Sequence, residues 1–235
     1  MKIKALVMEF IGTALLAAAI IGAGFMALTK TQDPMLSLVV NGFAAAAVLA
    51  VIIRLGASVS GAHYNPAVTF GLFLSKKIDA LTAILYFVAQ TAGAVAGAVL
   101  ANSLYHAFGT QIFPRSKNLQ QSGFLLLSEI LATAVLVWIV LKNSDDAKTV
   151  STLVPLWIFS AYFFTSSSTF ANPAATIGRI FTQSSAGIAP SSALRFVAAQ
   201  FIGAALGWLL HSFLTQEKES VVLELPEEVA SDPSL

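Results

Sequence analysis

Hydrophobic residues gather in long, nearly continuous runs along this chain rather than in short alternating segments. Six of these runs reach or approach the roughly 20 apolar residues that a membrane-spanning helix needs. They cover 5–28, 35–53, 80–103, 123–141, 149–164 and 194–213. Polar stretches containing Asp, Asn, Gln, Ser or Pro separate most of them. The pattern predicts an all-α membrane protein with six transmembrane helices.

Two further apolar runs, 66–75 and 173–182, are too short to cross a membrane. Proline is favoured at the first position of a helix, and asparagine caps a helix start well. Irregular backbone at membrane depth is tolerated where protein surrounds it or where it lines a wet cavity. We therefore predict two re-entrant half-helices. Each begins at an Asn-Pro-Ala box, formed by Asn65, Pro66 and Ala67 and by Asn172, Pro173 and Ala174.

The boxes belong to a longer internal repeat. Residues 65–71 and 172–178 are identical at five of seven positions. Glu9 and Glu129 lie in similar settings in the first and fourth runs. The pattern Ala-Gln-x-x-Gly-Ala-x-x-Gly starts at Ala89 in the third run and recurs in the sixth. Glycines spaced in this way allow helices to approach closely.

Each half thus holds three spans and one half-helix. Because three is an odd number, the second half must be inverted relative to the first, and such inverted repeats place their site near the membrane midplane. We expect one unit over 1–215, with repeats of about 1–110 and 119–215.

Composition agrees with a membrane protein. Hydrophobic residues make up 57% of the chain and charged residues 11%, against roughly 25% charged residues in soluble domains. The chain has no cysteine, no cluster with metal-ligand spacing and no nucleophile beside a base. We therefore predict neither an enzyme nor a metal, a cofactor or a nucleic-acid partner.

Charge distribution predicts the orientation. With the N-terminus inside, eight Lys or Arg residues fall on the cytoplasmic side and five outside, in agreement with the positive-inside rule. Six of the twelve acidic residues lie after Gln216. We expect a multi-pass protein of the cell membrane (inner or plasma membrane), surrounded by lipid, with both termini cytoplasmic. Segment 216–235 is predicted to be an acidic, disordered tail.

The paired boxes suggest a passage for small neutral solutes. Two half-helices entering from opposite sides would bring two positive dipole ends together. The amides of Asn65 and Asn172 could then donate hydrogen bonds to a solute, while the dipoles oppose cations and protons. The alternative is that each asparagine only caps its helix.

Three other polar residues have two readings each. Glu9 and Glu129 could accept hydrogen bonds from the irregular backbone before each half-helix, or could carry protons in an ion-coupled secondary transporter, since intramembrane acids are functional candidates. His63 could line the cytoplasmic vestibule or serve as a buried structural residue. The passive channel and the transporter therefore remain two alternatives.

The segment Gly-Ala-His-Tyr-Asn-Pro-Ala-Val-Thr at 61–69 resembles the aquaporin, or major intrinsic protein, family, as do the second box and the duplicated Glu and Ala-Gln elements. The similarity extends over about 5–213. It implies six spans, two re-entrant half-helices, one pore per subunit, a homotetramer, and water or small neutral solutes as substrates.

One position departs from the family. An arginine typically follows the second box and narrows the outer selectivity filter, but here Ala175 occupies that place. Counting from the boxes predicts the remaining filter residues at Ala45, Ser160 and Thr169. Such a filter would be wide and would lack its usual cation. Glycerol, urea or uncharged metalloid hydroxides such as arsenous acid then become candidate solutes, and the chain resembles bacterial members with this altered box.

Arg179 lies four residues after Ala175, about 6 Å further along a helix. Because helical side chains lean back toward the N-terminus, Arg179 could reach the outer vestibule and partly replace the missing cation. Alternatively, it could extend to lipid headgroups.

Overall fold

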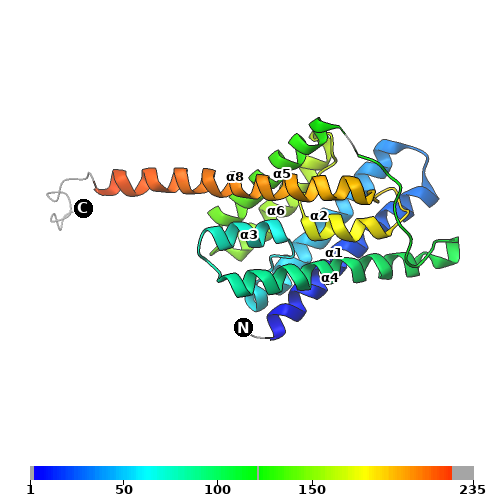
Figure 1. Ribbon diagram of the computed structural model, residues 1–235, viewed down its shortest axis with the longest axis horizontal. Helices are drawn as coiled ribbons and strands as arrows, with labels where there is room; N and C mark the ends of the chain where they lie inside the picture. The colour runs from blue at the N-terminus through cyan, green and yellow to red at the C-terminus, as the bar shows by residue number, and fades with distance from the viewer. Residues whose placement is uncertain (1–2, 121, 224–235) are drawn as a thin grey trace.

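The computed structural model describes residues 3–120 and 122–223 (Figure 1). Six of its helices are long and apolar enough to span a membrane, and each contains one of the six predicted runs. This confirms the predicted all-α membrane fold. The six are α1 (Ile3–Lys30), α2 (Pro34–Ser60), α4 (Ala80–Leu104), α5 (Gly123–Lys142), α6 (Ala147–Phe164) and α8 (Pro190–Leu223).

The remaining helices are short. The predicted half-helices are α3 (Pro66–Leu74) and α7 (Pro173–Gly178), and each begins at the proline of its box. The second half-helix was expected to run to 182. Instead, its α-helical part stops at Gly178 and continues as the 3₁₀ turn η2 (Arg179–Phe181). A second 3₁₀ turn, η1 (His106–Phe108), follows α4.

Polar residues between the hydrophobic runs cap the helices that follow them. Asp33, Asp79, Ser122 and Asp146 each accept at least one hydrogen bond from a backbone N–H in the first turn of α2, α4, α5 and α6, respectively. These N–H groups have no partner within the helix. The caps therefore explain where four of the six spans begin.

The two halves pack in the same way. Helix α1 lies along α4, and α5 lies along α8. A Cβ atom on Gly97 of α4 would lie 2.2 Å from the carbonyl oxygen of Ala14, and one on Gly207 of α8 would lie 2.3 Å from that of Ala134. Any side chain at these glycines would separate the helices, so the predicted close approach is confirmed at matched positions.

We call the end of the bundle where α1 begins the near end, and the opposite end the far end. The spans alternate in direction, so α2 and α8 start at the far end. The connection between α4 and α5 crosses the far end, while α8 projects beyond the bundle at the near end (Figure 1). Helix α8 runs to Leu223 rather than stopping near 213, since Gln, Glu and Lys at 216–219 favour helix. The rest of the predicted tail, 224–235, lies outside the described residues.

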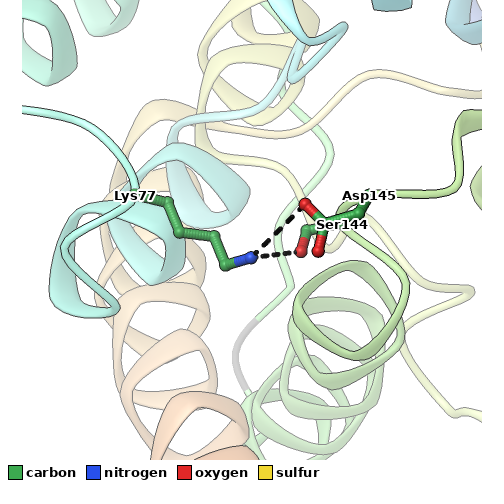
Figure 2. Close-up of polar contacts among 3 residues, drawn as sticks. All are labelled: Lys77, Ser144 and Asp145. Carbon is green, nitrogen blue, oxygen red and sulfur yellow. Dashed lines mark hydrogen bonds and ion pairs between the residues drawn. The ribbon is translucent and has the colours of Figure 1, made fainter.

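A polar contact joins two turns at the near end. Lys77, after α3, donates a hydrogen bond to the Ser144 hydroxyl and forms an ion pair of 3.8 Å with Asp145, between α5 and α6 (Figure 2). Asp145 is almost fully exposed. Exposed pairs of this kind contribute about 0–1 kcal/mol, so this contact adds little to the stability of the fold.

Candidate functional site

The two boxes meet inside the bundle. In each box the asparagine is the N-cap of its half-helix. The Asn65 side-chain oxygen accepts a hydrogen bond from the Ala67 N–H at 2.9 Å, and that of Asn172 accepts from the Ala174 N–H at 3.0 Å and the Ala175 N–H at 3.1 Å. Both asparagines therefore cap their half-helices.

The same asparagines also connect the two halves. Asn65 Nδ2 donates to the Ala171 carbonyl at 2.8 Å, and Asn172 Nδ2 donates to the Tyr64 carbonyl at 2.9 Å. Each amide carries two hydrogens, so each keeps one donor beyond this contact. The reciprocal pair fixes the N-termini of α3 and α7 against each other.

The backbone enters each half-helix through left-handed conformations at matched positions. In the first half Gly61, Ala62 and Tyr64 have φ values of 85°, 53° and 49°. Such conformations cost non-glycine residues of order 1–3 kcal/mol each. The fold must therefore stabilise these segments elsewhere. Their counterparts in the second half have φ values of 54°, 45° and 46° at Ser168, Thr169 and Ala171.

The two glutamates provide this support. Glu9 is fully buried and accepts hydrogen bonds from the Ser60 hydroxyl, the backbone N–H groups of His63 and Tyr64, and Gln90 Nε2, at 2.6–3.0 Å. A carboxylate has acceptor sites for all four donors. The irregular segment before α3 is thus tied to α1 and α4.

Glu129 repeats this arrangement in the second half, with four donors at 2.6–2.9 Å. It is also fully buried. Its donors are the Ser167 hydroxyl, the Phe170 and Ala171 N–H groups and Gln200 Nε2. The matched donor sets favour the loop-supporting reading over the proton-carrying one.

A narrow central cavity of about 70 Å³ passes the meeting point of the half-helices. Asn65 and Asn172 both line it, and aliphatic side chains form most of the remaining wall. His63 lines it on the near side, where its Nδ1 lies 3.0 Å from the Thr69 hydroxyl. His63 is therefore both a lining residue and a hydrogen-bonded one. The cavity offers a few polar contacts along an otherwise apolar path.

Three of the four predicted filter residues, Ala45, Thr169 and Ala175, line this cavity and are 1–2% exposed. Ser160 is exposed and does not line it, whereas Ile158 on the same helix does. Two residues along a helix correspond to about 200° of rotation. The prediction for Ser160 assumed no gap in a shortened fifth span, and the structure places this residue away from the cavity.

A wider cavity of about 380 Å³, the far vestibule, opens at the far end. Arg179 lines it, as does Phe170, which also borders the central cavity. Asn41 and Tyr162 line the vestibule as well and were not predicted. Asn41 has one sequence signal, its spacing of four residues from the predicted filter residue Ala45 on α2.

A metal ion would need a group of side chains among the described residues that could hold it. Within 3–120 and 122–215, no three His, Cys, Asp or Glu side chains come together as a metal site. The buried carboxylates are fully occupied by structural donors. What the arrangement provides is a narrow, mostly apolar passage with amide donors at its centre and two positive helix ends facing it.

Inverted halves, half-helices meeting at their N-termini and a cavity lined by both boxes define the class of membrane channels with re-entrant helices. Comparisons with known proteins identify the family. The profile described as major intrinsic protein matches residues 1–171. The chain belongs to this family, the one that the Asn-Pro-Ala boxes indicated.

Two relatives and one solved structure illustrate the similarity. The chain is 36% identical over 225 residues to aquaglyceroporin AqpS of Rhizobium meliloti (strain 1021), covering 95% of each chain. It is 34% identical over 180 residues to aquaporin PIP2-5 of Oryza sativa subsp. japonica, covering 70% of this chain and 62% of that one. The aquaglyceroporin structure from Plasmodium falciparum superposes with a TM-score of 0.73, at 22% identity, over 89% of this chain and 95% of that chain.

Proposed function

We propose that this protein is a passive transmembrane channel for water and small uncharged solutes. The observation that carries the proposal is the pair of boxes: Asn65 and Asn172 face one narrow cavity where two positive helix ends meet. Neutral solutes exchange hydrogen bonds there, while cations meet an electrostatic barrier. Family membership supports a channel rather than an enzyme.

The range of solutes that can pass depends on the side chains at the predicted filter positions. Ala45, Thr169 and Ala175 are small, and none carries a charge. We expect such small side chains to leave room for solutes beyond water, such as glycerol, urea or arsenous acid. The relative named an aquaglyceroporin supports this range.

The remaining expectations concern the setting of the channel. The near end, with its excess of Lys and Arg, is the cytoplasmic side of the cell membrane. The far vestibule then opens outside, and Arg179 supplies a cation near the filter. Lipid surrounds the bundle, whose many exposed apolar side chains suit that environment. The assembly is a homotetramer with one pore in each subunit, and the acidic tail is cytoplasmic.

The test is stopped-flow permeability of proteoliposomes to water, glycerol, urea and arsenous acid on one preparation. We expect all four fluxes to exceed those of protein-free liposomes. In Ala175→Arg, which fills the filter level, glycerol and arsenous acid flux should fall about tenfold while water flux falls less, as expected when a narrow pore rejects by size. Ser160→Ala, a change on the exposed side of α6, is the control. Equal loss of all fluxes in Ala175→Arg would contradict a wide filter at this level.

A further inference from the structure

Polar and aromatic side chains form a second level of lining, one helical turn beyond the predicted filter. On each of three chain segments, a residue that lines the central cavity lies four positions from a residue that lines the far vestibule. Four residues correspond to about 6 Å along a helix. The three pairs, each written with the inner residue first, are Ala45 and Asn41, Ile158 and Tyr162, and Ala175 and Arg179.

The segment from Ala175 to Arg179 forms a regular helical turn, although the 3₁₀ turn η2 starts at Arg179. The Arg179 N–H donates to the Ala175 carbonyl, as in a regular α-turn. On all three segments the step leads toward the far end. A level of small and aliphatic side chains is thus followed, one turn outward, by a level with an amide, a phenol and a guanidinium.

Hydrogen bonds hold the first two groups of the outer level in place. The Tyr162 hydroxyl donates to Asn41 Oδ1 at 3.2 Å, and Asn41 Nδ2 donates to the Ile20 carbonyl at 2.9 Å. The Tyr162 ring also packs on Gly42, where a Cβ atom would lie 3.1 Å from the ring. Three helices, α1, α2 and α6, therefore fix one side of this level.

Arg179 forms the other side. Its side chain is only 6% exposed, its guanidinium carbon lies 3.3 Å from the centre of the Phe170 ring, and its Nε donates to the Ala186 carbonyl. No carboxylate among residues 3–120 and 122–215 pairs with it, since the ion pair found there joins Lys77 and Asp145. Its terminal nitrogens donate to no protein acceptor in that part of the chain. A buried guanidinium with free donors thus borders the vestibule.

We infer that solutes are selected at the outer level, which is formed by Asn41, Tyr162, Phe170 and Arg179. This level lies one helical turn outward from Ala175, the position at which the family typically has its filter arginine. This inference rests on the proposed channel function and locates its selective step. Arg179 donates to oxygen atoms of a neutral solute, and the Tyr162 and Phe170 rings contact its carbon atoms. The same fixed positive charge repels protons and metal cations before they reach the boxes.

The experiment compares variants in proteoliposomes, measuring water and glycerol flux and the proton leak reported by an internal pH dye. Arg179→Ala should raise the proton leak and change the glycerol-to-water ratio by about tenfold, because it removes a charged hydrogen-bond donor from a desolvated site. Tyr162→Phe keeps the ring but frees Asn41, and should change the ratio about threefold, in proportion to one neutral hydrogen bond. Arg195→Ala, an exposed arginine on α8, is the matched control.

A double variant tests the position of the level itself. Ala175→Arg combined with Arg179→Ala keeps one cation and moves it one turn inward. We expect the proton leak to return to the wild-type value while glycerol flux falls below it. If Arg179→Ala does not fold, Arg179→Lys, which keeps the charge but loses the planar fork, should still shift the glycerol-to-water ratio.

Two results would overturn different claims. If the Arg179 and Tyr162 variants conduct water normally and match Arg195→Ala in both the ratio and the proton leak, the outer level is not selective, although the channel function stands. If wild-type liposomes pass no more water or glycerol than protein-free ones, the channel function itself fails.

Discussion

At the scale of single residues, the hydrogen-bond donors around the two buried glutamates indicate what these side chains do. Each accepts four hydrogen bonds, two of them from the backbone N–H groups that lead into a half-helix. A carboxylate acts only as an acceptor when ionised, which is what these positions require. These hydrogen bonds favour a role in holding the two boxes in register over a role in carrying protons through the membrane.

Replacing Glu129 by Gln tests this role. The new amide turns one acceptor into a donor that faces existing donors, and a buried unsatisfied group costs about 1–3 kcal/mol. We expect a lower melting temperature for detergent-purified Glu129→Gln, and a similar loss for Glu9→Gln. Ser160→Ala should melt like the wild type. Variants that keep wild-type melting but lose a gradient-driven flux would identify the glutamates as proton carriers instead.

At the scale of helices and their connections, small residues decide how closely the elements approach. Tyr64 is buried between α1 and α2, where its hydroxyl donates to the Ile52 carbonyl at 3.0 Å. A Cβ atom on Gly12 would lie 2.1 Å from the Tyr64 ring. The Tyr64 ring therefore fits only because Gly12 has no side chain.

Gly12→Ala should therefore destabilise the fold by about 1–3 kcal/mol, the usual cost of overpacking. Combining it with Tyr64→Leu, which removes part of the ring, should cost less than the sum of the two single changes. Thermal unfolding of the three variants in one detergent measures the coupling. Strict additivity would contradict the contact.

The N-cap of α6 should make the stability of the fold depend on pH. The Thr149 hydroxyl and the backbone N–H groups of Thr149 and Lys148 donate to Asp146 and hold the pKa of its carboxyl below the usual value of 3.8. The folded pKa lies below the unfolded one, so this cap stabilises α6 above about pH 4 and is lost as the pH falls through the folded pKa.

Asp146→Asn, an amide that also caps but does not titrate, should remove this part of the pH dependence. Unfolding midpoints at pH 7, 5 and 3 measure it, and the wild type should lose more stability than Asp146→Asn between pH 5 and 3. An equal loss would show that the cap does not contribute.

At the scale of the whole molecule, hydropathy and the duplicated boxes predict most of the architecture. Six long runs and two short ones correspond to the six spans and two half-helices, because length alone separates elements that cross from those that do not. The pairing of Glu9 with Glu129 predicts the support of both boxes. These inferences succeed because they depend on local patterns that each half repeats.

The details of the lining were less predictable. Ser160 was misplaced because the count assumed no gap in a shortened fifth span, whereas Ile158, two residues earlier on α6, lines the cavity. Asn41 and Tyr162 were missed because their spacing from lining residues does not by itself distinguish a lining residue from a buried one. Arg179 was noticed from its spacing alone, and its contacts with Phe170 and Ala186 depend on packing between segments.

The most direct test of the central claim, that this protein is a passive channel, is the final distribution of labelled glycerol across proteoliposomes with and without imposed proton or sodium gradients. A passive channel lets the internal concentration rise to the external one and no higher, at a rate that the gradients do not change. Accumulation above the external concentration, driven by either gradient, would contradict the account and favour an ion-coupled transporter.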